Sequence, residues 1–189
     1  MAITAGDKPK RRIAYGVSLM ACHNARAAPR RAIGYKLSSE RQRARHMPGY
    51  KLISVFIVAV FLNYLWELAQ APLYVGMEYY NAGVFWHCFV ASLGDGIMVL
   101  LIVGAGWIML KRRDWFERPG IAGYVVMLTA GFILALLVEW LGLHVLRRWE
   151  YSERMPVLPV LRVGVAPIAQ MLFLPPLIFR IVSFFSAKR

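Results

Sequence analysis

Four long apolar stretches constrain this chain more than any other feature of its sequence. They run over residues 52–75, 84–110, 121–146 and 163–185, and the charged side chains inside them are Glu67, Asp95, Glu139 and Arg180. A helix needs about 20 apolar residues to cross a hydrocarbon core of about 30 Å. The sequence therefore predicts an all-α integral membrane bundle of four transmembrane helices, in a domain over residues 51–189.

The composition agrees with a lipid environment. Of the 189 residues, 59% are hydrophobic and 17% are charged, and the mean hydropathy is +0.50. Soluble domains carry about one quarter charged residues. An ordinary soluble protein is excluded on these grounds.

Most of the net charge of +13 lies in the first 51 residues, which hold twelve Lys or Arg against Asp7 and Glu40. A basic segment beside a membrane is attracted to anionic lipid. The segment has no nucleic-acid-binding motif and no interleaved aromatic residues, which argues against nucleic acid as a partner. We expect residues 1–50 to form a basic, poorly ordered cytoplasmic tail whose partners are the lipid bilayer and its anionic headgroups.

Three other interpretations of this tail stay open. KPKRR followed by IAYGVSLMAC resembles a signal peptide with a lipobox-like end at Cys22, although lipidation there would leave eight bases on the outside. The Arg-rich, acid-poor leader also resembles an organelle transit peptide. Alternatively, Met47 is the true start, because MPGYKLISVF leads directly into the first span.

The basic residues of the connections predict an orientation. The second connection, KRRDWFERPG, holds four bases and the C-terminal end holds Arg180, Lys188 and Arg189, all on the side of the tail if there are four spans. On the opposite side, the first connection, GMEYYNAG, holds no Lys or Arg, and the third connection holds four. Since positively charged connections stay in the cytoplasm, we expect both termini there.

Polar side chains gather on particular faces of the spans. Asn63, Glu67 and Gln70 follow the helical period and share one face of the first span. In the second span His87 lies about 80° around the helix from Asp95. An ionisable group inside the membrane is costly, so such groups usually face a protein interior or water and find partners there.

Depth along the spans suggests that these groups form one polar layer, in the outer half of the membrane with Asp95 near the middle. Carboxylate and imidazole together suit a divalent metal such as zinc, iron or manganese. We therefore predict a site with possible metal ligands Glu67, His87, Asp95 and Glu139 and with supporting polar groups Asn63, Gln70, His144 and Gln170.

Two plainer interpretations accompany this prediction. The three amides are typical of hydrogen bonds that hold membrane helices together, and His144 is typical of an interfacial residue near the end of a span. No HExxH, P-loop or GxSxG motif occurs, so the sequence assigns neither a catalytic residue nor a cofactor beyond the possible divalent metal.

The third connection, RRWEYSERMPVLPVLR, mixes charged residues, the aromatic residues Trp149 and Tyr151, and an apolar run with prolines. It is expected either to fold back as a lid over the polar layer or to lie at the interface as an aromatic belt.

The order WELAQAPLY, then His with GD eight residues later, then EW, then WEYSERMP, then APIAQ resembles a group of small multi-pass bacterial membrane proteins without an assigned activity. The resemblance covers residues 60–177 and implies a location in the bacterial inner (plasma) membrane, but it implies no reaction. The positions that carry it are Trp66, Glu67, Gln70, His87, Gly94, Asp95, Glu139, Trp140, Trp149, Tyr151, Met155, Pro156 and Gln170.

Three functional hypotheses follow from the sequence. The first is a carboxylate and histidine site that binds a cation, a proton or a metal in a transporter-like or metal-handling component, with His87 as ligand or proton relay. The second is a membrane-embedded enzyme acting on a lipid or quinone-like substrate, in which one carboxylate serves as base. The third is an accessory or assembly subunit of a membrane complex. Because four spans are few for a monomeric transporter, the first hypothesis requires a homo-oligomer or a larger complex.

Overall fold

In a computed structural model of the chain, residues 49–79 and 83–187 are described, and this part of the chain is helical without a strand. The long helices are α2 (Gly49–Gln70), α3 (Gly83–Leu110), α4 (Gly120–Trp140) and α5 (Val165–Ala187), and the short ones are the 3-10 turns η1 (Ala71–Leu73) and η2 (Trp115–Glu117) and the π-helical turn η3 (Leu141–Val145). The tail predicted for residues 1–50 lies almost entirely outside the described residues.

Four helices are long and apolar enough to cross a membrane, and with their short extensions they run over Gly49–Leu73, Gly83–Leu110, Gly120–Val145 and Val165–Ala187. The predicted all-α fold with four such helices is confirmed, with span boundaries shifted by three residues or fewer. The chain has the architecture of a multi-pass membrane protein.

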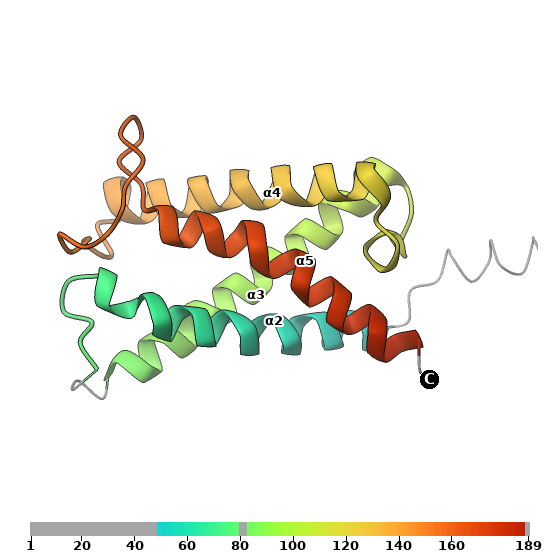
Figure 1. The fold of residues 1–189 in the computed structure, drawn as a ribbon, viewed down its shortest axis with the longest axis horizontal. Coiled ribbons are helices and arrows are strands. Elements are labelled where there is room, and N and C mark those ends of the chain that lie inside the picture. Colours follow the sequence, from blue (N-terminus) through green and yellow to red (C-terminus); the bar gives the residue numbers. More distant parts are fainter. Residues whose placement is uncertain (1–48, 80–82, 188–189) are drawn as a thin grey trace, which may run out of the picture. The chain divides into compact units, whose positions relative to one another are not determined.

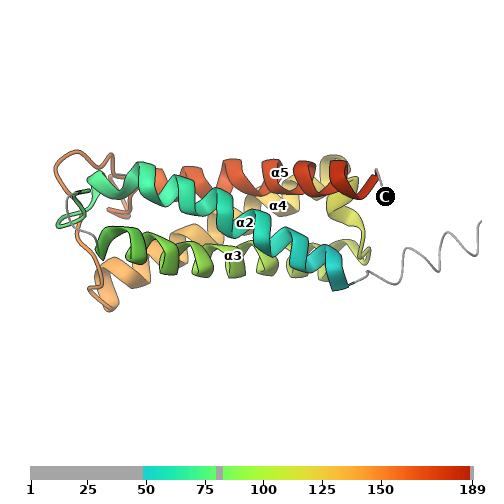
Figure 2. The same cartoon turned by 90° about the horizontal axis from the view of Figure 1, so that it is seen from below.

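The helices form an up-down-up-down bundle. Each packs against its two neighbours, α2 against α3 and α5, and α4 against α3 and α5 (Figure 1; Figure 2). The first residues of α2, the η2 turn and the last residues of α5 lie at one end of the bundle (Figure 1). At this end Lys51 donates to Glu117 across 2.5 Å, which ties the start of α2 to the η2 turn.

The apolar core fills the half of the bundle nearer to this end. Trp115 of the η2 turn is fully buried and donates from its indole N–H to the carbonyl of Val103 across 3.0 Å. Its ring meets that of Phe179 edge-on at 5.6 Å, and Phe116 lies 5.4 Å from the same Phe179 ring. Aromatic pairs at these distances contribute attraction beyond their buried area.

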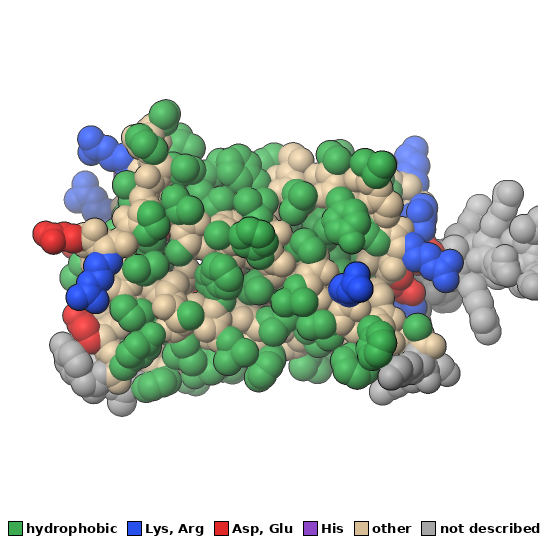
Figure 3. Space-filling view, viewed as in Figure 1, with side chains coloured by type: hydrophobic (Ala, Val, Ile, Leu, Met, Phe, Trp, Pro, Cys, Tyr) green, Lys and Arg blue, Asp and Glu red, His purple; other side chains and the backbone are tan. Residues whose placement is uncertain are grey.

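The outer surface of the bundle is apolar, as lipid contact requires. Along α2 the side chains of Ile53, Ile57, Phe61 and Leu65 recur every four residues, and each is about half exposed or more. Figure 3 shows hydrophobic side chains over the middle of the bundle and most charged side chains at its two ends. The buried polar residues lie inside instead, namely Asn63, Gln70, Ser92, Asp95, Glu139 and Gln170. Polar inside and apolar outside is the distribution of a membrane-embedded bundle.

Candidate functional site

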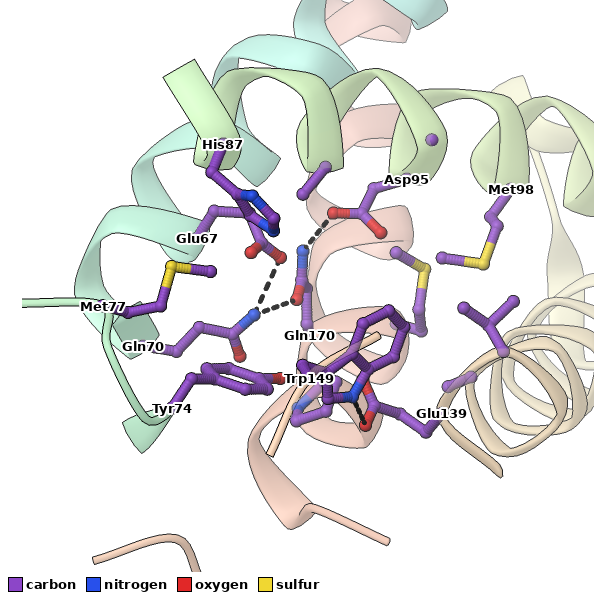
Figure 4. Close-up of a pocket in the computed structure, with 16 residues that line it drawn as sticks. Glu67, Gln70, Tyr74, Met77, His87, Asp95, Met98, Glu139, Trp149 and Gln170 are labelled. Carbon is purple, nitrogen blue, oxygen red and sulfur yellow. Dashed lines mark hydrogen bonds between the residues drawn. The ribbon is translucent and has the colours of Figure 1, made fainter. Parts of the chain in front are cut away.

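A cavity of about 270 Å³ lies in the half of the bundle away from the η2 turn. All four helices contribute to it, and the connection between α4 and α5 adds Trp149 (Figure 4). Its polar lining consists of Glu67, Gln70, Tyr74, His87, Asp95, Glu139, Trp149 and Gln170. None of the residues that line it, all of them within the described ranges, is a Lys or Arg.

Gln170 is the centre of the polar network beside this cavity. Its amide N–H groups donate to Asn63 on α2 and to Asp95 on α3, both across 2.8 Å. Its side-chain oxygen accepts from Gln70 across 3.2 Å. A single side chain of α5, with 1% of its surface exposed, therefore ties three helices together in a region where each unpaired polar group is costly.

Gln70 extends the network along α2. Its amide N–H groups donate to Glu67 across 2.7 Å and to Gln170, while its oxygen accepts from the indole N–H of Trp66 across 3.2 Å. Asn63 uses its own amide to donate to the carbonyl of Ala59 across 2.8 Å. Both N–H groups of each glutamine are thus already engaged, and the cavity gains no free donor from them.

The carboxyl groups of Glu67 and Asp95 line the same cavity, although they come from different helices, and the amides of Gln70 and Gln170 link them. Two carboxylates offer only acceptors, so they repel each other unless a proton or a cation lies between them. The Glu67–Asp95 pair is therefore a position on the cavity wall that favours positive charge.

Glu139 stands apart from that pair, near the end of α4. Its Oε2 atom accepts from the indole N–H of Trp149 across 3.4 Å and from the hydroxyl of Tyr151 in a short hydrogen bond. The Tyr151 oxygen also accepts from the backbone N–H of Gly164 across 2.8 Å. Within the described ranges, no hydrogen bond to Glu139 Oε1 is formed.

The connection after η3 is held across the end of α2. The Val75 N–H donates to the Glu150 carbonyl across 3.0 Å, and the Ser152 N–H donates to the Leu73 carbonyl across 2.9 Å. Tyr74 and Tyr151 meet in an isolated antiparallel bridge. This pairing places Trp149 against the cavity, whereas Tyr151 contacts Glu139 without lining the cavity, and the lid stays a prediction.

Both tyrosines of this bridge lie away from bulk water. Burial raises the pKa of Tyr151 above its usual value, and the hydrogen bond to Glu139 raises it further. Burial also raises the pKa of Tyr74. Both phenols therefore stay protonated at neutral pH, and Tyr151 acts as the donor to Glu139.

The structure brings most of the predicted site residues together. Glu67, His87, Asp95 and Glu139 line the same cavity, as do Gln70 and Gln170, and Asn63 joins them through Gln170. His144 does not line it. This residue is exposed, its ring lies 5.9 Å from that of Trp140, and one ring nitrogen is 3.3 Å from the Leu161 carbonyl.

Several lining residues were not predicted from the sequence. Tyr74 follows Glu67 by seven residues and so continues the stripe of Asn63, Glu67 and Gln70, a signal that was available. The apolar lining had no such signal, because nothing distinguishes these residues from the other apolar residues of the spans and of the first connection. It consists of Met77, Ala91, Met98, Ala135, Val138, Pro167 and Met171, with Gly94 as a further lining residue.

A shared cavity is not the same as a metal site. Over residues 49–79 and 83–187, no three His, Cys, Asp or Glu side chains converge in a group that could hold a metal ion. The Glu67–Asp95 pair and Glu139 are instead separate acceptor positions on one cavity wall.

Comparisons with family models, with curated proteins and with solved structures found no match. The resemblance to the group of small bacterial membrane proteins therefore stays a prediction.

Proposed function

We propose that this multi-pass membrane protein binds a cation in the carboxyl-lined cavity, and that a proton occupies the Glu67–Asp95 pair when the cation is absent. One observation carries the proposal. Carboxyl groups from α2, α3 and α4 line a single cavity, and none of its described lining residues is a Lys or Arg to neutralise them. Buried carboxylates without a base need a proton or a cation.

The hydrogen bonds around the cavity support a cation rather than an anion as the ligand. The amide donors of Gln70 and Gln170 are directed at the carboxyl groups of Glu67 and Asp95, at the Asn63 side chain or at each other. The cavity wall therefore presents mainly acceptor atoms, with the His87 ring and the Tyr74 hydroxyl as the exceptions. Acceptor oxygens attract a positively charged donor or a metal cation.

The cavity lies at the end of the bundle away from Lys51, the η2 turn and the last residues of α5. If the positive-inside orientation holds, this end faces the outside of a bacterial inner membrane. The proposed role is then that of a transporter-like or cation-handling component that takes its ligand from the outer side. A homo-oligomer or a larger complex would supply the remainder of any translocation path.

Proton release tests this proposal directly. A cation that enters the cavity repels the proton held by the Glu67–Asp95 pair, and this proton is released into solution. Full-length protein in phosphatidylcholine nanodiscs, in weakly buffered solution with a pH indicator dye, would be mixed separately with sodium, zinc and methylammonium chloride. At least one of them is expected to release protons in proportion to the protein.

Glu67→Gln and Asp95→Asn should each reduce this release at least tenfold, because a neutral amide cannot share the proton. Glu78→Gln is the matched control, since Glu78 is an exposed carboxylate outside the spans, and it should release protons as the wild type does. Absence of release from folded wild-type protein with every cation would overturn the proposal. It would leave the assembly-subunit hypothesis, which predicts copurification with a larger complex.

A further inference from the structure

We infer that the cation this site accepts is organic, namely a protonated amine on a small apolar or aromatic body, whose ammonium group binds Glu139. This inference rests on the proposed function, since it names the class of ligand for the same cavity. Its support comes from the size of the cavity, its apolar wall and the unused acceptor of Glu139.

The cavity is too large for a bare inorganic ion. Its volume of about 270 Å³ corresponds to roughly nine water molecules at about 30 Å³ each. Sites for small organic molecules begin near this size, at about 300 Å³. A metal ion with protein ligands needs converging side chains instead, and in the described part of the chain no three candidate ligands converge.

The wall of the cavity suits an apolar body. The sulfur-containing side chains of Met77, Met98 and Met171 line it, together with the aliphatic side chains of Ala135 and Val138. Methionine is flexible and polarisable, so it adapts to irregular ligands and contacts aromatic rings favourably. An inorganic cation gains nothing from such a surface, whereas an organic one buries apolar area there.

Two aromatic side chains contribute to the lining of the cavity, and one of them contacts Glu139. Trp149 and Tyr74 both line it, and Figure 4 shows the Trp149 ring beside Glu139, with Tyr74 on the other side of that ring. The face of an aromatic ring attracts an ammonium group, most strongly when water is excluded. A carboxylate flanked by aromatic rings is a combination that recognises alkylammonium ions.

The acceptor for the ammonium group is Oε1 of Glu139. Trp149 and Tyr151 both donate to Oε2 of this carboxyl group and so fix its position. Among residues 49–79 and 83–187 no donor occupies Oε1, which remains able to accept from a ligand. Glu67 and Asp95 accept from the amides of Gln70 and Gln170, whereas the two donors to Glu139 are aromatic side chains, so its Oε1 atom lies beside the rings.

Three probes separate the contributions of charge and of apolar body. Phenethylammonium carries both, 2-phenylethanol has the body without the charge, and methylammonium has the charge without the body. Binding to full-length protein in phosphatidylcholine nanodiscs would be measured by equilibrium dialysis at neutral pH. Protein-free nanodiscs would correct for partition into lipid. Phenethylammonium is expected to bind with a dissociation constant at least tenfold lower than that of either other probe.

Variants then assign this binding to the cavity. Glu139→Gln should raise the dissociation constant of phenethylammonium at least tenfold, and Glu78→Gln should leave it unchanged. Ala91→Leu narrows the cavity without removing a carboxylate, so it should weaken phenethylammonium binding while proton release by smaller cations persists. This second variant keeps the test valid if Glu139→Gln fails to fold.

The outcomes distinguish this inference from the proposed function. Proton release by sodium or zinc without preferential binding of phenethylammonium would overturn the organic ligand and leave the cation site standing. Equal binding of phenethylammonium and 2-phenylethanol would also overturn it, because charge would then contribute nothing. Failure of both assays in folded protein would overturn both proposals.

Discussion

Gln170 on α5 donates a hydrogen bond of 2.8 Å to the carboxyl group of Asp95 on α3, although 75 residues separate them in the sequence. Gln170 is 1% exposed and Asp95 is 9% exposed. The bond therefore joins two polar groups that have little access to water. Removing either partner leaves the other unpaired in a region of low polarity, where that loss is expensive.

Gln170→Leu should lower the free energy of unfolding by about 2 kcal/mol. It removes hydrogen bonds to Asn63, Asp95 and Gln70. Each interhelical hydrogen bond in a membrane protein contributes about 0.6 kcal/mol on average, and leaving buried partners unsatisfied adds to the loss. The change in the free energy of unfolding would be measured by far-UV circular dichroism while SDS is titrated into mixed micelles. Phe173→Leu, on the exposed surface of the same helix, should stay within about 0.5 kcal/mol of the wild type. Equal transition midpoints for all three proteins would contradict the prediction.

Gly106→Ala should destabilise the protein by about 1 to 3 kcal/mol through overpacking. A Cβ atom at Gly106 would lie 2.1 Å from Cε2 of the fully buried Trp115, so the indole would have to move. Gly104→Ala is the matched control two residues away on α3, since a Cβ there meets nothing within 4 Å. This control should stabilise the helix by about 0.4 to 1 kcal/mol. Thermal unfolding in detergent followed by circular dichroism measures both variants, and equal shifts would refute the packing argument.

Tyr151→Phe should reduce the loss of stability at alkaline pH. Burial and Glu139 raise the pKa of the folded Tyr151 phenol, whereas the unfolded value is about 10. The stabilisation that the protonated Tyr151 phenol gives the folded state is complete below pH 10. It is lost as the pH rises through that value toward the pKa of the folded state. The transition midpoint of the wild type should fall more steeply above pH 10 than that of the variant. Tyr124→Phe, a control near the surface of α4, should behave as the wild type does. Parallel curves for wild type and Tyr151→Phe would count against the assignment.

Gly142→Ala should displace Trp149 from the cavity. A Cβ atom at Gly142 would lie 2.1 Å from the Trp149 ring, which can move only by leaving its place beside Glu139. The fluorescence of Trp149 is obtained by subtracting the signal of the Trp149→Phe variant. Acrylamide should quench this fluorescence more strongly in Gly142→Ala than in the wild type, and phenethylammonium should bind at least fivefold more weakly. Gly104→Ala is the control, because Gly104 is outside the cavity lining and a Cβ there meets nothing within 4 Å. Unchanged quenching in Gly142→Ala would show that the position of the Trp149 ring does not depend on this glycine.

Helical periodicity was sufficient to predict part of the site. Asn63, Glu67 and Gln70 share a face because the helix period fixes their directions within one helix. His144 was placed in the site by its depth along the third span, which gives no information about its direction around the helix. After Trp140 the chain continues in the π-helical turn Leu141–Val145, which changes the rotation per residue, and His144 lies outside the cavity. Periodicity within one helix also gives no information about which partner on another helix a side chain meets.

The sequence by itself determined the four apolar helices, because a span depends on the length and hydropathy of one continuous segment. It also determined that Glu67, Asp95 and Glu139 are costly groups in need of partners. Only the tertiary structure decided which partners they have: Asp95 accepts from Gln170, Glu67 accepts from Gln70, and Glu139 accepts from Trp149 and Tyr151. These pairings depend on how the helices are rotated and how far each is shifted along its neighbours. Packing of side chains such as Trp115 against Gly106 contributes to both, and no local sequence pattern encodes either.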